Sequence, residues 1–144
     1  MQNKKAFTLV ELVFVIALIG ILSAVAIPKL AATRKDAVIT VGTNVVASVR
    51  SAIAIEHQKR IFRGDFSAIT TLDNDNDNSR IFTMFNMDNQ DMNNSVLEYP
   101  VKQGKNIGEW SVNESTYTFH LKDENCTFTL KNNSFISNCS IMNL

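Results

Sequence analysis

The sequence is poor in the residues that usually mark catalytic and metal sites. It has two Cys, two His and five Gly among 144 residues, and it contains no phosphate-binding glycine loop and no nucleophile motif. Two Cys and two His are too few for a four-cysteine zinc ribbon. The 14 basic side chains balance the 14 acidic ones, so no overall charge marks a nucleic-acid-binding protein, and no direct nucleic-acid site is identified. The sequence therefore favours a protein that is not an enzyme and holds no cofactor.

Charge is scarcest near the N-terminus, where a long apolar run begins. Between Lys5 and Lys29 the one charged side chain is that of Glu11. As a helix, residues 7–27 would span roughly 31 Å, the thickness of one bilayer core. Basic residues precede the run, so the positive-inside rule places this end in the cytoplasm and the rest of the chain outside the inner membrane.

Three interpretations of the apolar run compete. It is a secretory signal peptide cleaved near residues 24–26, a permanent membrane anchor, or a segment that starts in the membrane and then moves into an assembly. Glu11 decides among them, because a carboxylate in hydrocarbon costs about 2.5–3.5 kcal/mol or more. A signal peptide and a plain anchor have no use for such a group. Its presence predicts a functional site with a partner.

The residues around Glu11 resemble a known processing signal. The stretch 4–12, KKAFTLVEL, is similar to the class III leader of type IV pilins and type II secretion pseudopilins. In that family a prepilin peptidase cuts before a Phe and methylates the new amine, which implies cleavage between Ala6 and Phe7. The family usually has Gly where this chain has Ala6. Glu11 stands four residues after Phe7, where the family has its hallmark acid.

The resemblance implies a chain of three parts. Residues 1–6 are a cleaved leader, residues 7–28 a transmembrane and filament-core helix, and residues 29–144 a periplasmic head. Gly20 and Pro28 fall where the family has a helix-softening Gly and a kinking Pro. The expected fold class is α+β, a pilin-like lollipop in which a long N-terminal helix, membrane half then amphipathic half, packs on a small antiparallel sheet.

The resemblance also implies what the Glu11 carboxylate does. In a filament it can pair with the Phe7 amine of the next subunit. Pairing offsets the desolvation penalties of the carboxylate and the amine, whereas a wrong register leaves both charges unpaired. The alternative is that Glu11 only reaches toward a membrane face. The expected partners are other copies of the chain, minor pilins, the prepilin peptidase, the inner-membrane assembly platform and the inner membrane itself.

The helix is predicted to continue beyond Pro28 to about Ile61. Apolar residues recur three and four positions apart, which is typical of one helix face: Val38, Val41, Val45, Val49, Ala52 and Ile53. Charged residues are expected off this stripe: Arg34, Lys35, Asp36, Arg50, Glu56 and Lys59. Gly42 is interpreted as a weaker point of the helix.

The middle of the chain is polar and irregular. Asp65 predicts the start of a short helix over 66–72, and Ser79 that of a second helix carrying Ile81, Phe82 and Phe85.

An acidic run lies between these two predicted helices. Asp73, Asp75 and Asp77 resemble the start of an EF-hand calcium loop. Asn78 and Met84 then stand where that loop needs Gly and a bidentate Glu. The pattern favours a solvated loop of turn-forming residues, with a calcium site as the alternative.

The C-terminal part predicts antiparallel strands by its alternation of apolar and polar residues. One strand carries Tyr117, Phe119 and Leu121, with Trp110 and Val112 beginning this strand or the one before it. The next carries Cys126, Phe128 and Leu130, and Phe135 begins a third.

The turn between the last two strands is predicted at Asn132-Asn133, because Asn tolerates the positive φ of a type I′ turn. A two-residue turn fixes the register, in which Leu130 faces Phe135 and Cys126 faces Cys139 on an open pair about 4.5 Å apart at Cα. That separation permits a disulfide, and an oxidising compartment favours it over two free thiols.

The resemblance implies a structural filament subunit. It is expected in a type IV pilus-like or type II secretion pseudopilus filament that supports protein export or DNA uptake (competence). A surface adhesion or motility pilin is the alternative. A membrane-anchored periplasmic binding domain is the alternative from another class.

Overall fold

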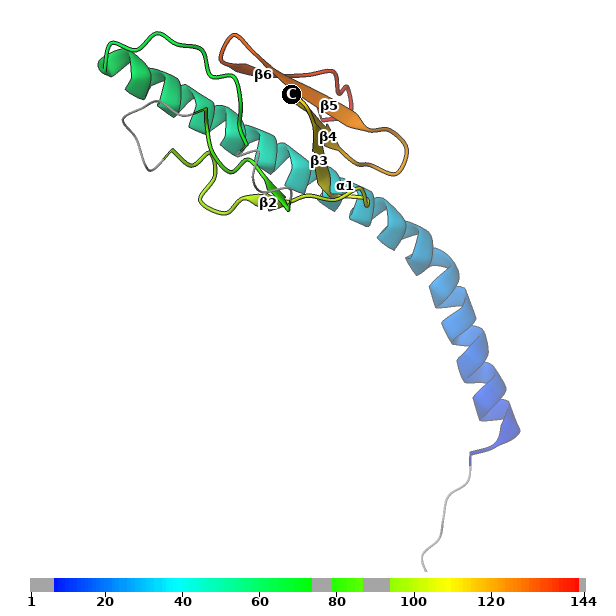
Figure 1. Cartoon of the computed structure of the whole chain (residues 1–144). Helices are drawn as coiled ribbons and strands as arrows, with labels where there is room; N and C mark the ends of the chain where they lie inside the picture. Colours follow the sequence, from blue (N-terminus) through cyan, green and yellow to red (C-terminus); the bar gives the residue numbers. More distant parts are fainter. Residues whose placement is uncertain (1–6, 74–78, 87–93, 143–144) are drawn as a thin grey trace, which may run out of the picture. The chain divides into compact units, whose positions relative to one another are not determined.

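The computed structural model describes residues 7–73, 79–86 and 94–142. Its elements are α1 (Leu9–Phe62), β1 (Arg80–Ile81), β2 (Val101–Lys102), β3 (Trp110–Asn113), β4 (Thr116–Phe119), β5 (Cys126–Lys131) and β6 (Ser134–Ser137) (Figure 1). A long N-terminal helix followed by small antiparallel sheets confirms the predicted α+β class. The chain divides into two compact units, Met1–Ala37 and Val38–Leu144. The predicted boundaries after residues 6 and 28 concern cleavage and the membrane, and they stay predictions.

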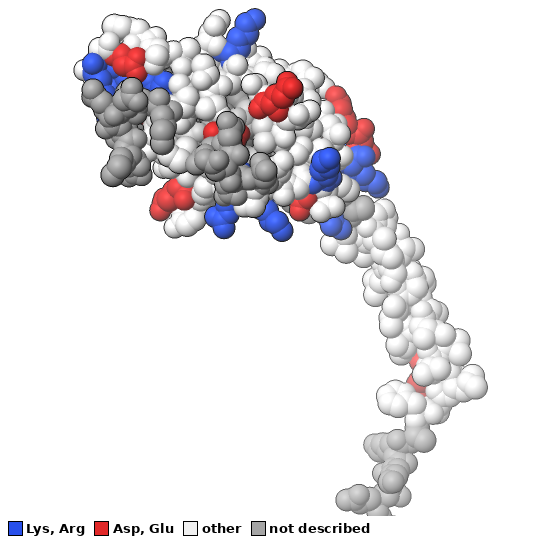
Figure 2. Space-filling model, in the orientation of Figure 1, with Lys and Arg blue, Asp and Glu red and all other residues white. Residues whose placement is uncertain are grey.

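The first unit contains the beginning of α1, which includes Pro28. We call residues 7–28 the apolar segment. Its 14 large hydrophobic side chains are between 44% and 84% exposed. Figure 2 shows a white surface along it, interrupted by acidic atoms, in keeping with Glu11 as its one charged side chain. By length and composition, α1 can cross a membrane. Among the described residues, a Cβ added at Gly20 would meet nothing within 4 Å, and the softening predicted there and at Pro28 stays a prediction.

The second unit is the head, built on the rest of α1. A four-stranded antiparallel sheet has the order β3-β4-β5-β6, and β1 pairs with β2 in a separate two-stranded ribbon. Trp110 and Val112 lie on β3, which is the strand before the one that carries Tyr117 and Phe119. Leu121 lies just beyond the end of β4.

Aromatic rings fill the space between the sheet and α1. Phe82 stacks on Tyr117 with ring centroids 5.0 Å apart, and it meets Trp110 edge-on at 5.4 Å. Phe128 stacks on Phe135 at 5.2 Å. These rings are all nearly inaccessible to solvent. The apolar residues of the alternating strands therefore point into one core, as their period of two predicts.

The predicted hairpin is confirmed. Its turn residues, Asn132 and Asn133, have φ of 50° and 57°. Leu130 faces Phe135 in the β5–β6 register. Cys126 and Cys139 are joined by a disulfide, with their Cα atoms 4.9 Å apart.

The predicted helix over 66–72 is wrong, although these residues are all described. Asp65 accepts hydrogen bonds from the backbone N–H and the hydroxyl of Ser67, at 2.8 and 3.0 Å, and so closes a local turn. The N–H of Ile69 donates to Asn133 Oδ1 at 2.7 Å. This donor is thus taken by a residue of the β5–β6 turn instead of a helical carbonyl.

The helix predicted after Ser79 is also wrong. Its first residues form β1, which pairs with β2. Phe82 follows with a φ of 60°, and its N–H donates to Asp73 Oδ1 at 2.6 Å. Burial of Phe82 and Phe85 in the core sets this conformation, because the chain must turn both rings toward the sheet.

The face of α1 that packs on the head core matches most of the predicted stripe, since Val38, Val45, Val49, Ala52 and Ile53 lie in the core or pack against it. Its buried hydrophobic residues are Val46, Val49 and Ile53. Val41 is instead 57% exposed, and the next residue, Gly42, faces the core. A Cβ at Gly42 would lie 2.5 Å from both Met142 Cε and Phe119 Cε1. Gly42 is therefore a position of close packing. The interpretation of Gly42 as a weak point of the helix did not anticipate this role.

Candidate functional site

The helix begins in a capping box made by Thr8 and Glu11. The Thr8 N–H and hydroxyl donate to Glu11 Oε2 at 3.0 and 2.9 Å, and the Glu11 N–H donates to Thr8 Oγ1 at 3.3 Å. This is the reciprocal arrangement of an N-cap Thr with a Glu three residues later. The Thr-x-x-Glu spacing is visible in the sequence, but sequence reasoning assigned Glu11 to assembly alone and missed Thr8.

The predicted cleavage site lies beside this capping box. Phe7 is 84% exposed, and Ala6 lies outside the described residues. Glu11 is also exposed, and among the described residues Thr8 is the one that holds its carboxylate, which is open to a partner. The arrangement places the predicted cleavage site, an exposed aromatic residue and a carboxylate within six consecutive positions, 6–11.

The sequence comparisons match this part of the chain. The family model described as "Prokaryotic N-terminal methylation motif" matches residues 1–27. The type IV wide pilus major component PilA4 of Thermus thermophilus is 43% identical over 68 residues, which is 47% of this chain and 50% of the relative. Both matches support the resemblance of this chain to the type IV pilin and pseudopilin superfamily. The chain spans about half the length of the curated relative it matches, and no solved structure matches it significantly.

The head holds a buried ion pair near the end of α1. Arg60 Nε donates to Glu56 Oε1 at 2.9 Å, with side chains 1% and 5% exposed. The Arg60 Nη2 group also donates to the carbonyl oxygen of Asn86 at 3.0 Å. With its amide nitrogen turned toward Glu56, Asn94 donates to both carboxylate oxygens, at 3.1 and 3.2 Å. The Glu56–Arg60 pair therefore connects two loop residues, Asn86 and Asn94, to the helix by hydrogen bonds.

Sequence reasoning missed this pair. It expected Glu56 off the apolar stripe and did not single out Arg60. The i to i+4 spacing of Glu and Arg indicates a helix pair, but it does not show that the pair is buried.

The acidic run has only its first residue in the described part of the chain. Asp73 accepts the hydrogen bond from Phe82, while Asp75 and Asp77 lie outside the described residues. Burial and the negative charge of Asp73 raise the pKa of the Tyr117 hydroxyl well above its usual value. Asp73 thus interacts with two residues of the head core, Phe82 and Tyr117, and the calcium site stays a prediction.

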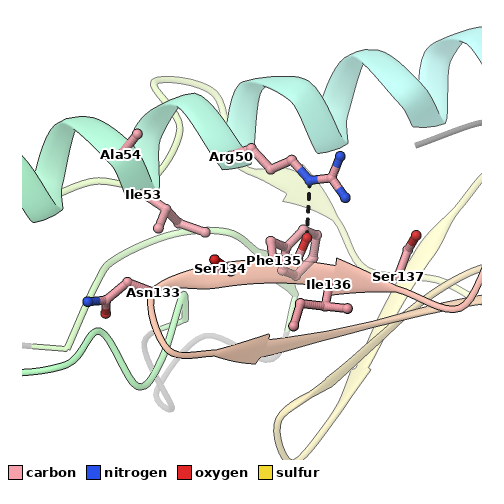
Figure 3. A pocket seen from close by; sticks show the side chains of 8 residues that line it. All are labelled: Arg50, Ile53, Ala54, Asn133, Ser134, Phe135, Ile136 and Ser137. Carbon is pink, nitrogen blue, oxygen red and sulfur yellow. Dashed lines mark hydrogen bonds between the residues drawn. The ribbon is translucent and has the colours of Figure 1, made fainter.

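An open groove runs between α1 and strand β6, the edge of the four-stranded sheet (Figure 3). It is lined by Arg50, Ile53, Ala54 and residues 133–137. Arg50 Nε donates to the Phe135 carbonyl oxygen at 3.1 Å, which occupies one acceptor of the open strand edge. A second groove lies between α1 and residues 97–101, and it is lined from α1 by Val41, Asn44, Val45 and Ser48.

Proposed function

We propose that this chain is a structural, non-enzymatic subunit of a type IV pilus-like filament. The observation that carries the proposal is a single carboxylate, Glu11, in an otherwise uncharged apolar segment that lies within the matched methylation motif. A charge in that position requires a partner, because it is expensive in hydrocarbon. The matched relative is itself described as a major component of a type IV wide pilus.

In this proposal the chain is made as an inner-membrane protein that crosses the membrane once. Its N-terminus is cytoplasmic and its head periplasmic. A prepilin peptidase cleaves between Ala6 and Phe7 and methylates the Phe7 amine. The assembly platform then moves the apolar segment from lipid into a filament with other copies and minor pilins, where Glu11 pairs with the Phe7 amine of a neighbouring subunit.

The filament's cargo is a further proposal that rests on the resemblance. We propose protein export by a type II system, or DNA uptake by the same kind of machine, in preference to surface adhesion or motility. A strain lacking the gene should lose secretion of extracellular proteins or natural transformation. Loss of surface attachment with both of these intact would favour the adhesion role.

Mass spectrometry of the protein from its native membrane, with microscopy of sheared material, tests the proposed function. We expect a mature N-terminus at a methylated Phe7 and filaments that contain this chain. A mature chain beginning near Ile27 would indicate ordinary signal-peptide cleavage and overturn the proposal. An uncleaved chain that never assembles would instead favour a membrane-anchored binding domain.

A further inference from the structure

Five Asn residues of this chain begin Asn-x-Ser/Thr sequences, which are the acceptor signal for N-glycosylation: Asn93, Asn113, Asn125, Asn132 and Asn138. Such a short signal often occurs by chance, so the signal alone does not select among them. The bacterial form of the signal has in addition an acidic residue two positions before the Asn. Asn93 and Asn125 meet this condition, through Asp91 and Asp123. Asn93 lies outside the described residues, so the structure bears on Asn125.

Asn125 lies at the end of an exposed loop that joins β4 to β5. The side chains of residues 122–125 are all exposed, and the next residue, Cys126, begins β5. Within the described part of the chain, no hydrogen bond holds the Asn125 side chain. Surface loops of this kind accept a large added group without displacing the core. The Asn125 amide is therefore accessible to a modifying enzyme.

The hydroxyl of the same signal is presented on the same side of the chain. Successive side chains of a strand point to opposite faces of its sheet. Cys126 is 0% exposed and belongs to the core, so Asn125 and Thr127 on either side of it point outward. A glycan at Asn125 would thus extend away from the core and from α1, which packs on the inner face of the sheet.

The other three described signals are built into tighter structure. Asn113 ends β3 and is paired with Thr116 across a two-residue turn. Asn132 is itself a turn residue, with a φ of 50°. Asn138 Oδ1 accepts a hydrogen bond from the Thr127 N–H at 3.1 Å, so this amide is engaged with β5. These three signals also lack an acidic residue two positions earlier. Among the described signals, the one in the β4–β5 loop alone combines the acidic residue with an open loop.

We infer that Asn125 is an N-glycosylation site that takes an oligosaccharide from a polyprenyl pyrophosphate donor. In this transfer Asn125 Nδ2 attacks the anomeric carbon of the sugar, a C–N bond forms, and the C–O bond to the pyrophosphate breaks. The amide nitrogen gives up one proton to a base of the transferase, and the polyprenyl pyrophosphate leaves. No group is oxidised or reduced. The inference goes beyond the proposed function and shares with it the location of the head outside the inner membrane, where this transfer takes place in bacteria.

Tryptic peptides of the full chain, purified from its native cells and reduced, test this inference. Trypsin cleaves after Lys122 and Lys131, so peptide 123–131 carries the Asn125 signal alone. Peptides 106–122 and 132–144 carry the other three described signals and serve as internal controls. Tandem mass spectrometry should find a glycan on peptide 123–131 and none on the two control peptides. An unmodified peptide 123–131 would overturn the inference.

Neighbouring residues supply matched variants. Asp123→Ala should remove most of the glycan from peptide 123–131, whereas Glu124→Ala, which removes the adjacent exposed acid, should leave the occupancy unchanged. Thr127→Ser should keep the glycan, and Thr127→Val should abolish it because Val keeps the β-branched shape without the hydroxyl. Thermal unfolding of each variant checks that the head is folded. A glycan that persists in Asn125→Gln would be attached to a Thr hydroxyl and would overturn the inference.

The same spectra separate this inference from the proposed function. A methylated N-terminus at Phe7 together with an unmodified peptide 123–131 would overturn the inference and leave the filament role intact. A mature chain that begins near Ile27 and carries a glycan on peptide 123–131 would support the inference and overturn the filament role.

Discussion

Replacement of Arg60 by Met is expected to destabilise the head severely. Arg60 is 1% exposed, and its guanidinium donates to Glu56 Oε1 at 2.9 Å and to the Asn86 carbonyl at 3.0 Å. Methionine fills a similar volume but leaves the buried Glu56 carboxylate without its cation. Removing one partner of a buried pair costs about 3–5 kcal/mol.

The structure places the effect of Arg60→Met near the lower end of that range. Glu56 keeps two hydrogen bonds from Asn94, at 3.1 and 3.2 Å, and a longer contact to Lys59 Nζ at 3.8 Å. A loss of about 3 kcal/mol lowers the melting temperature of a domain of this size by roughly 12–20 °C. Thermal unfolding of the detergent-solubilised full chain, followed by near-ultraviolet circular dichroism of the core aromatics, measures this shift.

Lys59→Met provides a matched control, since Lys59 is 35% exposed and contacts the same carboxylate. It should cost less than about 1 kcal/mol, as exposed ion pairs do. In the double variant Glu56→Gln with Arg60→Met no charge is stranded, so part of the lost stability should return. Equal melting temperatures for Arg60→Met and Lys59→Met would refute the reasoning from burial.

Three further predictions concern other parts of the chain. Glu11→Ala should leave the head's melting temperature unchanged and reduce filament yield by a factor of a few hundred, since stranding a buried amine costs about 3–5 kcal/mol; normal filaments would contradict this. Gly42→Ala should destabilise the head by about 1–2 kcal/mol in thermal unfolding despite the better helix propensity of Ala, because its Cβ would meet Phe119 and Met142. Because the pKa of Tyr117 is raised in the folded head, the stabilisation linked to its neutral hydroxyl is fully present below about pH 10 and declines as the pH rises further. Tyr117→Phe should therefore flatten the fall in the free energy of unfolding between about pH 9 and pH 11.

The elements that the sequence predicts well are set by local rules. The β5–β6 hairpin follows from two adjacent Asn residues, because a two-residue turn leaves one register in which apolar side chains share a face. That register brings Cys126 opposite Cys139, as the structure confirms. The long helix follows from its apolar run and the amphipathic pattern after it.

The elements that it predicts poorly depend on distant partners. No helix forms over 66–72, where the N–H of Thr70 is taken by Asn86 Oδ1 at 2.9 Å, and that of Ile69 by a residue of the β5–β6 turn. On α1 the predicted stripe fails at Val41, which is exposed, while Gly42 admits Phe119 against the helix, a fit that periodicity alone does not reveal. In each case the contact that decides the structure joins residues far apart in the chain.

The capping box bears on how Glu11 can serve both the membrane state and the filament. In the monomer its carboxylate is bound by the Thr8 N–H and hydroxyl, so the charge is already hydrogen-bonded while the segment lies in lipid. Such a cap is worth about 1 kcal/mol, whereas an ion pair removed from solvent is worth several times more once its alternative is a stranded charge. In the proposed filament, pairing with a neighbour's Phe7 amine therefore outweighs the cap. In this proposal one carboxylate is stabilised locally before assembly and sets the register during it.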